Sequence, residues 1–150
     1  IVGDTFPGYE SYEQELKTLV IKNDLHQNIH FLGYRTDVEA ILAESDLFFH
    51  PSIAPDPLPT VLFEAIKMKV PLAATDLGGA VEILDYGNCG LLVPHTNPKK
   101  AADMINNYYK DDKLKTSNIK KAIEYSNKHF SPSQFNKNIL NLFKTTISSK

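Results

Sequence analysis

Short apolar runs alternate with stretches of helical periodicity along most of the chain. The runs NIHFLG (28–33), DLFFHP (46–51), PLAAT (71–75) and CGLLVP (89–94) have the length and composition of buried strands. Between them, apolar residues recur at the spacing of amphipathic helices, as in residues 9–23 and 59–69. This alternation predicts an α/β fold, in which a Rossmann-like parallel sheet is flanked by helices in three layers.

The last third of the chain predicts helices only. Asn97 followed by Pro98 is typical of a helix start, and that helix is expected to run to about residue 109. Two extra C-terminal helices are expected at about residues 114–130 and 133–148. The 150 residues therefore predict a single domain, 1–150. Because the chain lacks an initiator Met and begins with IVGD, typical of a strand end and its turn, we interpret it as a fragment.

Composition excludes several classes of protein and of site. The net charge of −2 does not favour nucleic acid, and no apolar run reaches the roughly 20 residues of a membrane span. The single cysteine, Cys89, excludes an internal disulfide and leaves no zinc-type cluster. Residues 99–150 hold eleven Lys and four acidic residues. We interpret this excess as a lysine-coated helical surface, with contact to an anionic membrane as the alternative.

Three loops follow predicted strands and are expected to meet at one edge of the sheet: 33–37, 50–59 and 76–79. In parallel sheets, ligands bind beyond the carboxyl ends of the strands. Gly78 and Gly79 would let a backbone approach a phosphate or sugar closely, and a simple tight turn is the alternative. The sequence contains neither a G-x-G-x-x-G nor a P-loop motif.

The segment PDPLPTVLFEA (55–65) combines a stiff loop with a helix start. Pro55 and Pro57 restrict the backbone on both sides of Asp56. The N–H groups of Thr60 and Val61 are expected to stay open at the helix N-terminus, which favours an anion such as phosphate. Asp56 is equally interpreted as a turn residue or as a ligand-binding carboxylate.

Glu64 has a similar alternative. It shares a helix face with Thr60 and Lys67, and periodicity alone favours a solvent-exposed polar stripe over a binding role.

Several segments occur together in a characteristic order: the F-L-G strand, DLFFHPS, an acid-x7-acid helix, a T-D-x-G-G turn followed by Glu82, and G-L-L-V-P. With this order, residues 1 to about 109 resemble the C-terminal half of a retaining glycosyltransferase of family 4, in the glycosyl transferases group 1 family. The resemblance implies the C-terminal half of a two-domain GT-B fold, whose C-terminal domain binds most of a nucleotide-sugar donor.

The resemblance also implies roles for the candidate residues. Glu64 would bind the ribose hydroxyls, while Asp56, at the position of a family Glu, would contact the transferred sugar and support an oxocarbenium-like transition state. Pro59 replaces a family Gly, which leaves Thr60 and Val61 as phosphate donors. The remaining matches are a loop that lines the base, at Gly33 and Tyr34, and a turn near the donor, at Gly78 and Gly79.

The function implied by the resemblance is transfer of a sugar from a UDP- or GDP-sugar to an acceptor hydroxyl, with retention, in polysaccharide or glycoconjugate synthesis. No cofactor or metal is expected, and no nucleic acid partner. The diphosphate-clamping basic residues and the N-terminal domain for a glycan or lipid-linked acceptor would precede this chain, so the fragment alone is expected to be inactive.

The expected location is cytoplasmic, with peripheral contact of the full-length protein at the inner face of the membrane as an open alternative. Two other functions also stay open. One is a nucleotide-sugar-binding module that works with a partner chain, and the other is a GT-B sugar-nucleotide epimerase.

Overall fold

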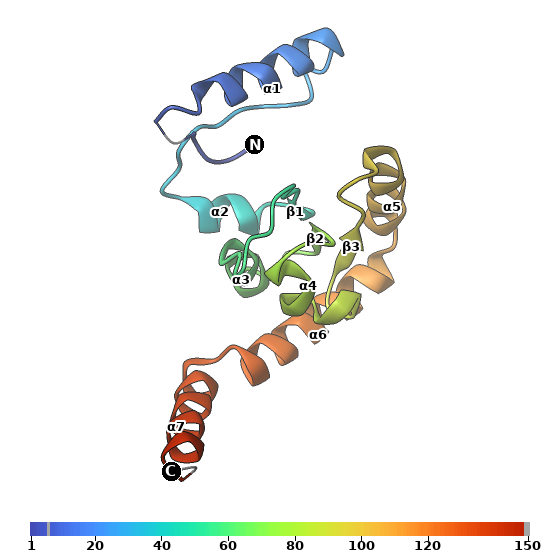
Figure 1. Ribbon diagram of the computed structural model, residues 1–150. Helices are drawn as coiled ribbons and strands as arrows, with labels where there is room; N and C mark the ends of the chain where they lie inside the picture. Colours follow the sequence, from blue (N-terminus) through green and yellow to red (C-terminus); the bar gives the residue numbers. More distant parts are fainter. Residues whose placement is uncertain (6, 149–150) are drawn as a thin grey trace. The chain divides into compact units, whose positions relative to one another are not determined.

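The computed structural model describes residues 1–5 and 7–148, which form two compact units, Ile1–Ala40 and Ile41–Lys150. Figure 1 shows the order of the elements along the chain. The helices in chain order are α1 (Glu10–Lys22), α2 (Val38–Ala43), α3 (Val61–Lys67), α4 (Gly79–Ile83), the 3-10 turn η1 (Asp85–Gly87), α5 (Pro98–Lys110), α6 (Asp112–His129) and α7 (Pro132–Ser148).

The first unit contains α1, close to the helix predicted at residues 9–23, but the predicted strand at 28–33 is wrong. This segment is extended, and among the described residues it makes three backbone hydrogen bonds to the start of the chain. The Ile1 amino group donates to the His30 carbonyl at 2.6 Å, Leu32 N–H to Ile1 at 2.9 Å, and Gly3 N–H to Gly33 at 2.9 Å. None of the described residues of this unit is buried.

The second unit is built on three parallel strands, β1 (Phe48–His50), β2 (Leu72–Thr75) and β3 (Leu91–Val93), in the order β1-β2-β3. Phe48 pairs with Leu72, and Ala73 pairs with Leu91. All three strands lie within predicted runs, which confirms the parallel sheet. Because β2 is the central strand, all four of its residues are buried.

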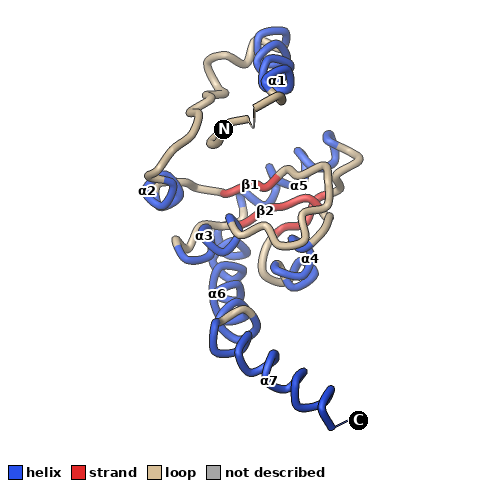
Figure 2. The backbone as a smooth tube through the Cα atoms, turned by 60° about the vertical axis from the view of Figure 1, so that its left-hand side comes forward, coloured by secondary structure: helices blue, strands red, loops and turns tan. Residues whose placement is uncertain are grey.

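Helices α3 and α4 connect the strands in sequence. Crossovers between parallel strands are right-handed as a rule, so two that step in the same direction place their helices on one face of the sheet. Figures 1 and 2 show α3, α4 and α6 on the same side of the strands. The core on this side includes Leu62 of α3, Ile83 of α4 and the following Leu84, which are 0–2% exposed.

Helices α5 and α6 each begin at a residue whose side chain caps the helix. Asn97 caps α5 by accepting the Lys100 N–H at 3.0 Å, with Pro98 in the first turn, as predicted. Asp111 caps α6 in the same way, accepting the Leu114 N–H at 2.9 Å. A capping side chain thus sets where each of these helices begins.

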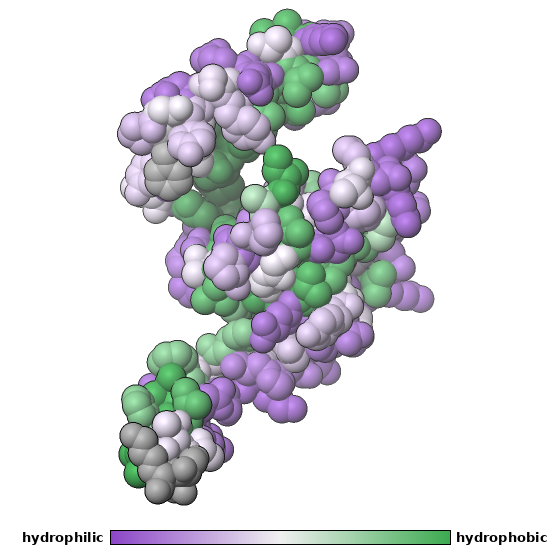
Figure 3. All heavy atoms as spheres, viewed as in Figure 1, coloured by the Kyte–Doolittle hydropathy of each residue, from purple (hydrophilic) through white to green (hydrophobic). Residues whose placement is uncertain are grey.

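The last helix, α7, is amphipathic, and its apolar side chains are exposed. Figure 3 shows apolar atoms gathered on its surface. They come from Phe135, Ile139, Leu140, Leu142, Phe143 and Ile147. Across the described residues, no helix combines the length and apolar character needed to cross a membrane.

Candidate functional site

The candidate site in the second unit lies at the carboxyl end of the sheet, where the loops 50–59 and 76–79 follow β1 and β2. We call these two loops the rim. The Gly79 N–H donates to the Asp56 backbone carbonyl at 2.7 Å, which joins the two loops. The Asp56 carboxylate accepts the Leu58 N–H through Oδ1 at 2.9 Å. The rim therefore brings together Asp56, Gly78 and Gly79, as the sequence predicts.

The two glycines are required because the loops pack backbone against backbone. A Cβ on Gly78 would lie 2.5 Å from the Asp56 carbonyl oxygen, and a Cβ on Gly79 would overlap the Pro57 carbonyl. Gly78 also has a φ of +59°, which side chains of L-residues rarely allow. The sequence predicted that Gly78 and Gly79 allow the backbone to approach a phosphate or sugar. In the structure, these glycines approach the backbone of the chain's own loop 50–59.

The N-terminus of α3 opens at the same rim. Leu62 and Phe63 donate to the carbonyls of Pro59 and Thr60, at 3.1 and 2.9 Å. Within the described residues, the N–H groups of Thr60 and Val61 donate to no backbone carbonyl. These two groups can therefore still receive an acceptor, and the first turn of a helix favours a negative one.

Glu64 lies in the first turn of α3, one helical turn beyond Thr60, and its side chain is exposed. Its carboxylate is thus accessible to a ligand at this end of the helix. Exposure alone fits both the polar stripe and the binding role that the sequence allows.

Two predicted site residues, Gly33 and Tyr34, belong to the first unit. Gly33 has a φ of +62°, and its carbonyl accepts the Gly3 N–H. Tyr34 is 76% exposed. The structure thus describes this pair within its own unit, and its role in lining a base stays a prediction.

One residue of the rim, Asp76, forms a pair with His95 that sequence reasoning missed. Asp76 follows β2 directly, and His95 lies just beyond β3. The Asp76 Oδ1 accepts two hydrogen bonds from His95, from Nδ1 at 2.8 Å and from the backbone N–H at 3.1 Å. These bonds hold the pKa of Asp76 below its usual value, so the carboxylate is ionised at neutral pH. The available signal was that both residues follow adjacent predicted strands.

One more polar atom at this end of the sheet has no partner. His50 is the last residue of β1, and its Nε2 is buried without a hydrogen bond to any described residue. A buried polar atom left in this state costs about 1–3 kcal/mol, which a water or ligand can offset. Around the described residues, no group of three His, Cys, Asp or Glu side chains could hold a metal ion.

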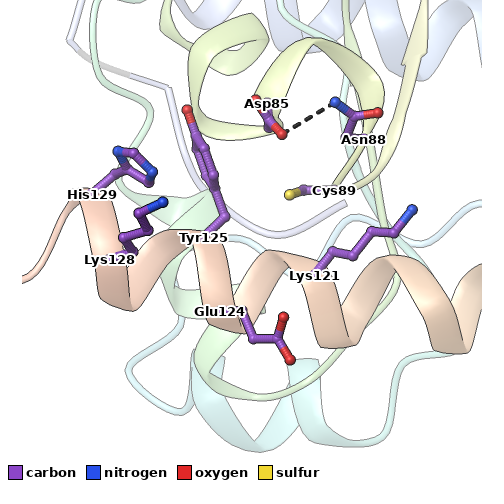
Figure 4. A pocket seen from close by; sticks show the side chains of 8 residues that line it. All are labelled: Asp85, Asn88, Cys89, Lys121, Glu124, Tyr125, Lys128 and His129. Carbon is purple, nitrogen blue, oxygen red and sulfur yellow. Dashed lines mark hydrogen bonds between the residues drawn. The ribbon is translucent and has the colours of Figure 1, made fainter.

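A separate cavity of about 250 Å³ lies at the amino end of β3, between η1 and α6. Figure 4 shows the Cys89 sulfur pointing into it, between Tyr125 and Lys121, below the hydrogen-bonded pair of Asp85 and Asn88. Burial raises the pKa of the Cys89 thiol, and the nearby Asp85 adds to this effect. The raised pKa disfavours the thiolate, which is the nucleophilic form of a cysteine.

Comparison with known proteins identifies the family. The family model described as Glycosyl transferases group 1 matches residues 1–125. A putative colanic acid biosynthesis glycosyltransferase, WcaL of Salmonella typhimurium, is 27% identical over 92% of this chain and 36% of its own length. The amylovoran biosynthesis glycosyltransferase AmsK of Erwinia amylovora is 25% identical over 67% of this chain and 26% of its own length. The chain thus spans about a third or less of these relatives.

Solved structures agree with this result. The Anabaena protein HepE in complex with UDP superposes with a TM-score of 0.85 at 28% identity, covering 96% of this chain and 40% of HepE. Its complex with UDP-glucose gives a TM-score of 0.84. The parallel sheet flanked by helices matches GT-B glycosyltransferase structures, as predicted. The chain belongs to the glycosyl transferases group 1 family.

Proposed function

We propose that this chain is the donor-binding domain of a retaining glycosyltransferase. The enzyme moves a sugar from a UDP- or GDP-sugar to an acceptor hydroxyl in polysaccharide or glycoconjugate synthesis. The nucleoside diphosphate leaves the anomeric carbon, and the acceptor oxygen replaces it with the same configuration. The family match and the relatives named for colanic acid and amylovoran biosynthesis support this proposal.

The observation that carries the proposal is the joining of the two rim loops. The hydrogen bond from the Gly79 N–H to the Asp56 carbonyl fixes the loop that carries the Asp56 carboxylate and leads into the N-terminus of α3. A nucleotide-sugar presents hydroxyls next to a diphosphate, so it needs hydrogen-bond acceptors and anion-binding groups close together. The rim combines both kinds of group.

We assign the groups to parts of the donor as follows. The N–H groups of Thr60 and Val61 face a phosphate, and the Glu64 carboxylate binds the ribose hydroxyls. Leu58 occupies Oδ1 of Asp56, so Oδ2 is the oxygen assigned to the transferred sugar. There it acts as the catalytic carboxylate, supporting positive charge that develops at the anomeric carbon.

The remaining parts of the proposal concern the whole enzyme. A glycan or lipid-linked acceptor binds a further, N-terminal domain, and the isolated 150 residues transfer no sugar. The enzyme works in the cytoplasm without a cofactor or metal, and peripheral membrane contact brings it to a lipid-linked acceptor.

A binding measurement tests the donor assignment. In the full-length enzyme, we expect Glu64→Gln to weaken UDP binding by about 10- to 100-fold, because one charged acceptor of the ribose hydroxyls is lost. Calorimetric titration with UDP, GDP and their glucose conjugates measures the affinity and selects the base.

The matched control is Glu124→Gln, which alters an exposed glutamate of α6. This residue lines the cavity at the amino end of β3, so UDP affinity should stay unchanged. Equal affinities of Glu64→Gln and wild type would overturn the ribose assignment and favour the solvent-exposed stripe.

A further inference from the structure

We propose that Asp76 and His95 are positioning residues of the donor site, and that they act on the donor through the loop 50–59, which we call the Asp56 loop. Their hydrogen bonds hold the turn 76–79 in the position from which it binds this loop. The inference rests on the proposed function, because it concerns how the same site is kept in shape.

Hydrogen bonds connect the carboxyl ends of β2 and β3. Besides the two bonds from His95 to Asp76 Oδ1, the Asp76 N–H donates to the Val93 carbonyl at 2.9 Å. Three hydrogen bonds therefore tie the residue that opens the turn to the segment 93–95. The carboxyl ends of β2 and β3 cannot separate without breaking them.

The charge on Asp76 strengthens the bond between the two side chains. The ionised Asp76 carboxylate can only accept, so His95 must carry a proton on Nδ1. This interaction is charge-assisted and stronger than a bond between neutral groups. Because the two side chains are 47% and 34% exposed, solvent weakens the pair and its value for global stability is small. Its effect is therefore local, on the turn.

The turn 76–79 is connected in turn to the Asp56 loop. Leu77 N–H donates to the Thr75 carbonyl at 2.8 Å, and Gly79 N–H donates to the Asp56 carbonyl at 2.7 Å. The backbone of the turn lies so close to Asp56 and Pro57 that neither glycine has room for a Cβ. Because the two backbones are closely packed, the turn cannot move without moving its neighbour. A shift of Asp76 therefore displaces the Asp56 loop.

The prolines make this coupling effective. Pro55 and Pro57 stiffen the loop, so it moves as a body when its contact with Gly79 moves. The open N–H groups of Thr60 and Val61 follow directly after the same loop. Loss of the pair should thus change donor affinity although neither side chain is assigned a contact with the donor.

Three variants of His95 in the full-length enzyme test the proposal. His95→Asn keeps an amide N–H close to the position of Nδ1, His95→Gln moves that group beyond reach of Asp76, and His95→Leu removes it. We expect the Kd for UDP to rise about fivefold or more in His95→Gln and His95→Leu, and to stay within about twofold of wild type in His95→Asn. The KM for the sugar donor should follow the same order.

Thermal unfolding of each variant separates positioning from folding. A purely structural role would lower the melting temperature and the active fraction without changing the Kd of the folded molecules. Equal UDP affinity of His95→Asn and His95→Gln overturns the proposal. Both variants lack the imidazole, and only His95→Asn keeps a side-chain bond to Asp76. Wild-type affinity in His95→Leu overturns it as well.

The same series distinguishes this inference from the proposed function. If the wild-type enzyme binds none of the tested nucleotides, the proposed function fails, and the inference fails with it. If wild type binds UDP, Glu64→Gln binds it weakly and all His95 variants bind it normally, only the positioning role fails.

Discussion

At the residue scale, the site depends on the absence of side chains at Gly78 and Gly79 as much as on its carboxylates. Gly79 is the more informative of the two. Its φ lies outside the left-handed region, so an Ala there would be excluded by lack of space and not by backbone strain. A substitution at Gly79 thus tests the contact with the Asp56 loop by itself.

We expect Gly79→Ala to destabilise the fold by about 1–3 kcal/mol through overpacking and to weaken UDP binding in parallel, because the Asp56 loop must move away. Chemical denaturation and calorimetry measure the two effects.

Gly87→Ala is the control. Gly87 has a φ of +96° but no atom closer than 4.0 Å to an added Cβ. It should cost about 1–2 kcal/mol in strain and leave UDP affinity unchanged. Normal UDP binding by Gly79→Ala would contradict the coupling of the loops.

At the element scale, helices α5 and α6 are held together by a buried polar contact. Tyr108 of α5 and Asn118 of α6 are 3% and 5% exposed, and Asn118 Nδ2 donates to the Tyr108 hydroxyl at 3.4 Å. Burial raises the pKa of Tyr108, so the phenol is neutral in the folded protein over a wider pH range than in the unfolded chain. The stabilising effect of the neutral phenol is complete below the pKa of tyrosine in the unfolded chain, about 10. It is lost as the pH rises through the raised pKa of Tyr108 in the folded protein.

We expect Tyr108→Phe to lower the free energy of unfolding by about 1 kcal/mol at pH 7, because Asn118 loses its buried partner. The variant should also lose that part of the alkaline destabilisation that comes from the phenol. Urea titrations at pH 7 and above pH 10 check both points. Tyr109→Phe alters the next residue, which is 47% exposed, and should change stability by less than about 0.5 kcal/mol. Equal effects of the two substitutions would mean that the buried contact has no special value.

At the scale of the whole molecule, burial is distributed unevenly between the two units. The described residues of Ile1–Ala40 include no buried side chain, whereas β2 in Ile41–Lys150 is buried throughout. The free energy of local opening follows the apolar burial around a segment. The two units should therefore open with different free energies.

Native-state hydrogen exchange measures this difference. We expect protection factors of the α1 amides to be at least about 100-fold lower than those of β2, which corresponds to a difference of about 2.7 kcal/mol. The comparison within one sample needs no variant, and α6 serves as an internal reference for a helix of the second unit. Equal protection of α1 and β2 would show that the two units unfold together.

The sequence by itself determined most elements and the stiffness of the proline-rich loop. Asn97 and Pro98 set the start of α5, and alternating apolar runs set β1 to β3, because capping and periodicity act between near neighbours in the chain. The strand expected at 28–33 was wrong: an apolar run shows that a segment is suitable for a sheet, whereas strand pairing depends on partners elsewhere.

Only the tertiary structure decided which groups meet at the rim. Sequence reasoning predicted that loops 50–59 and 76–79 converge, but not that the Gly79 N–H binds the Asp56 carbonyl. It missed the bond between Asp76 and His95, which lie 19 residues apart. The parallel register of β2 and β3 brings that pair together, and a register joins distant residues without leaving a local pattern at either one.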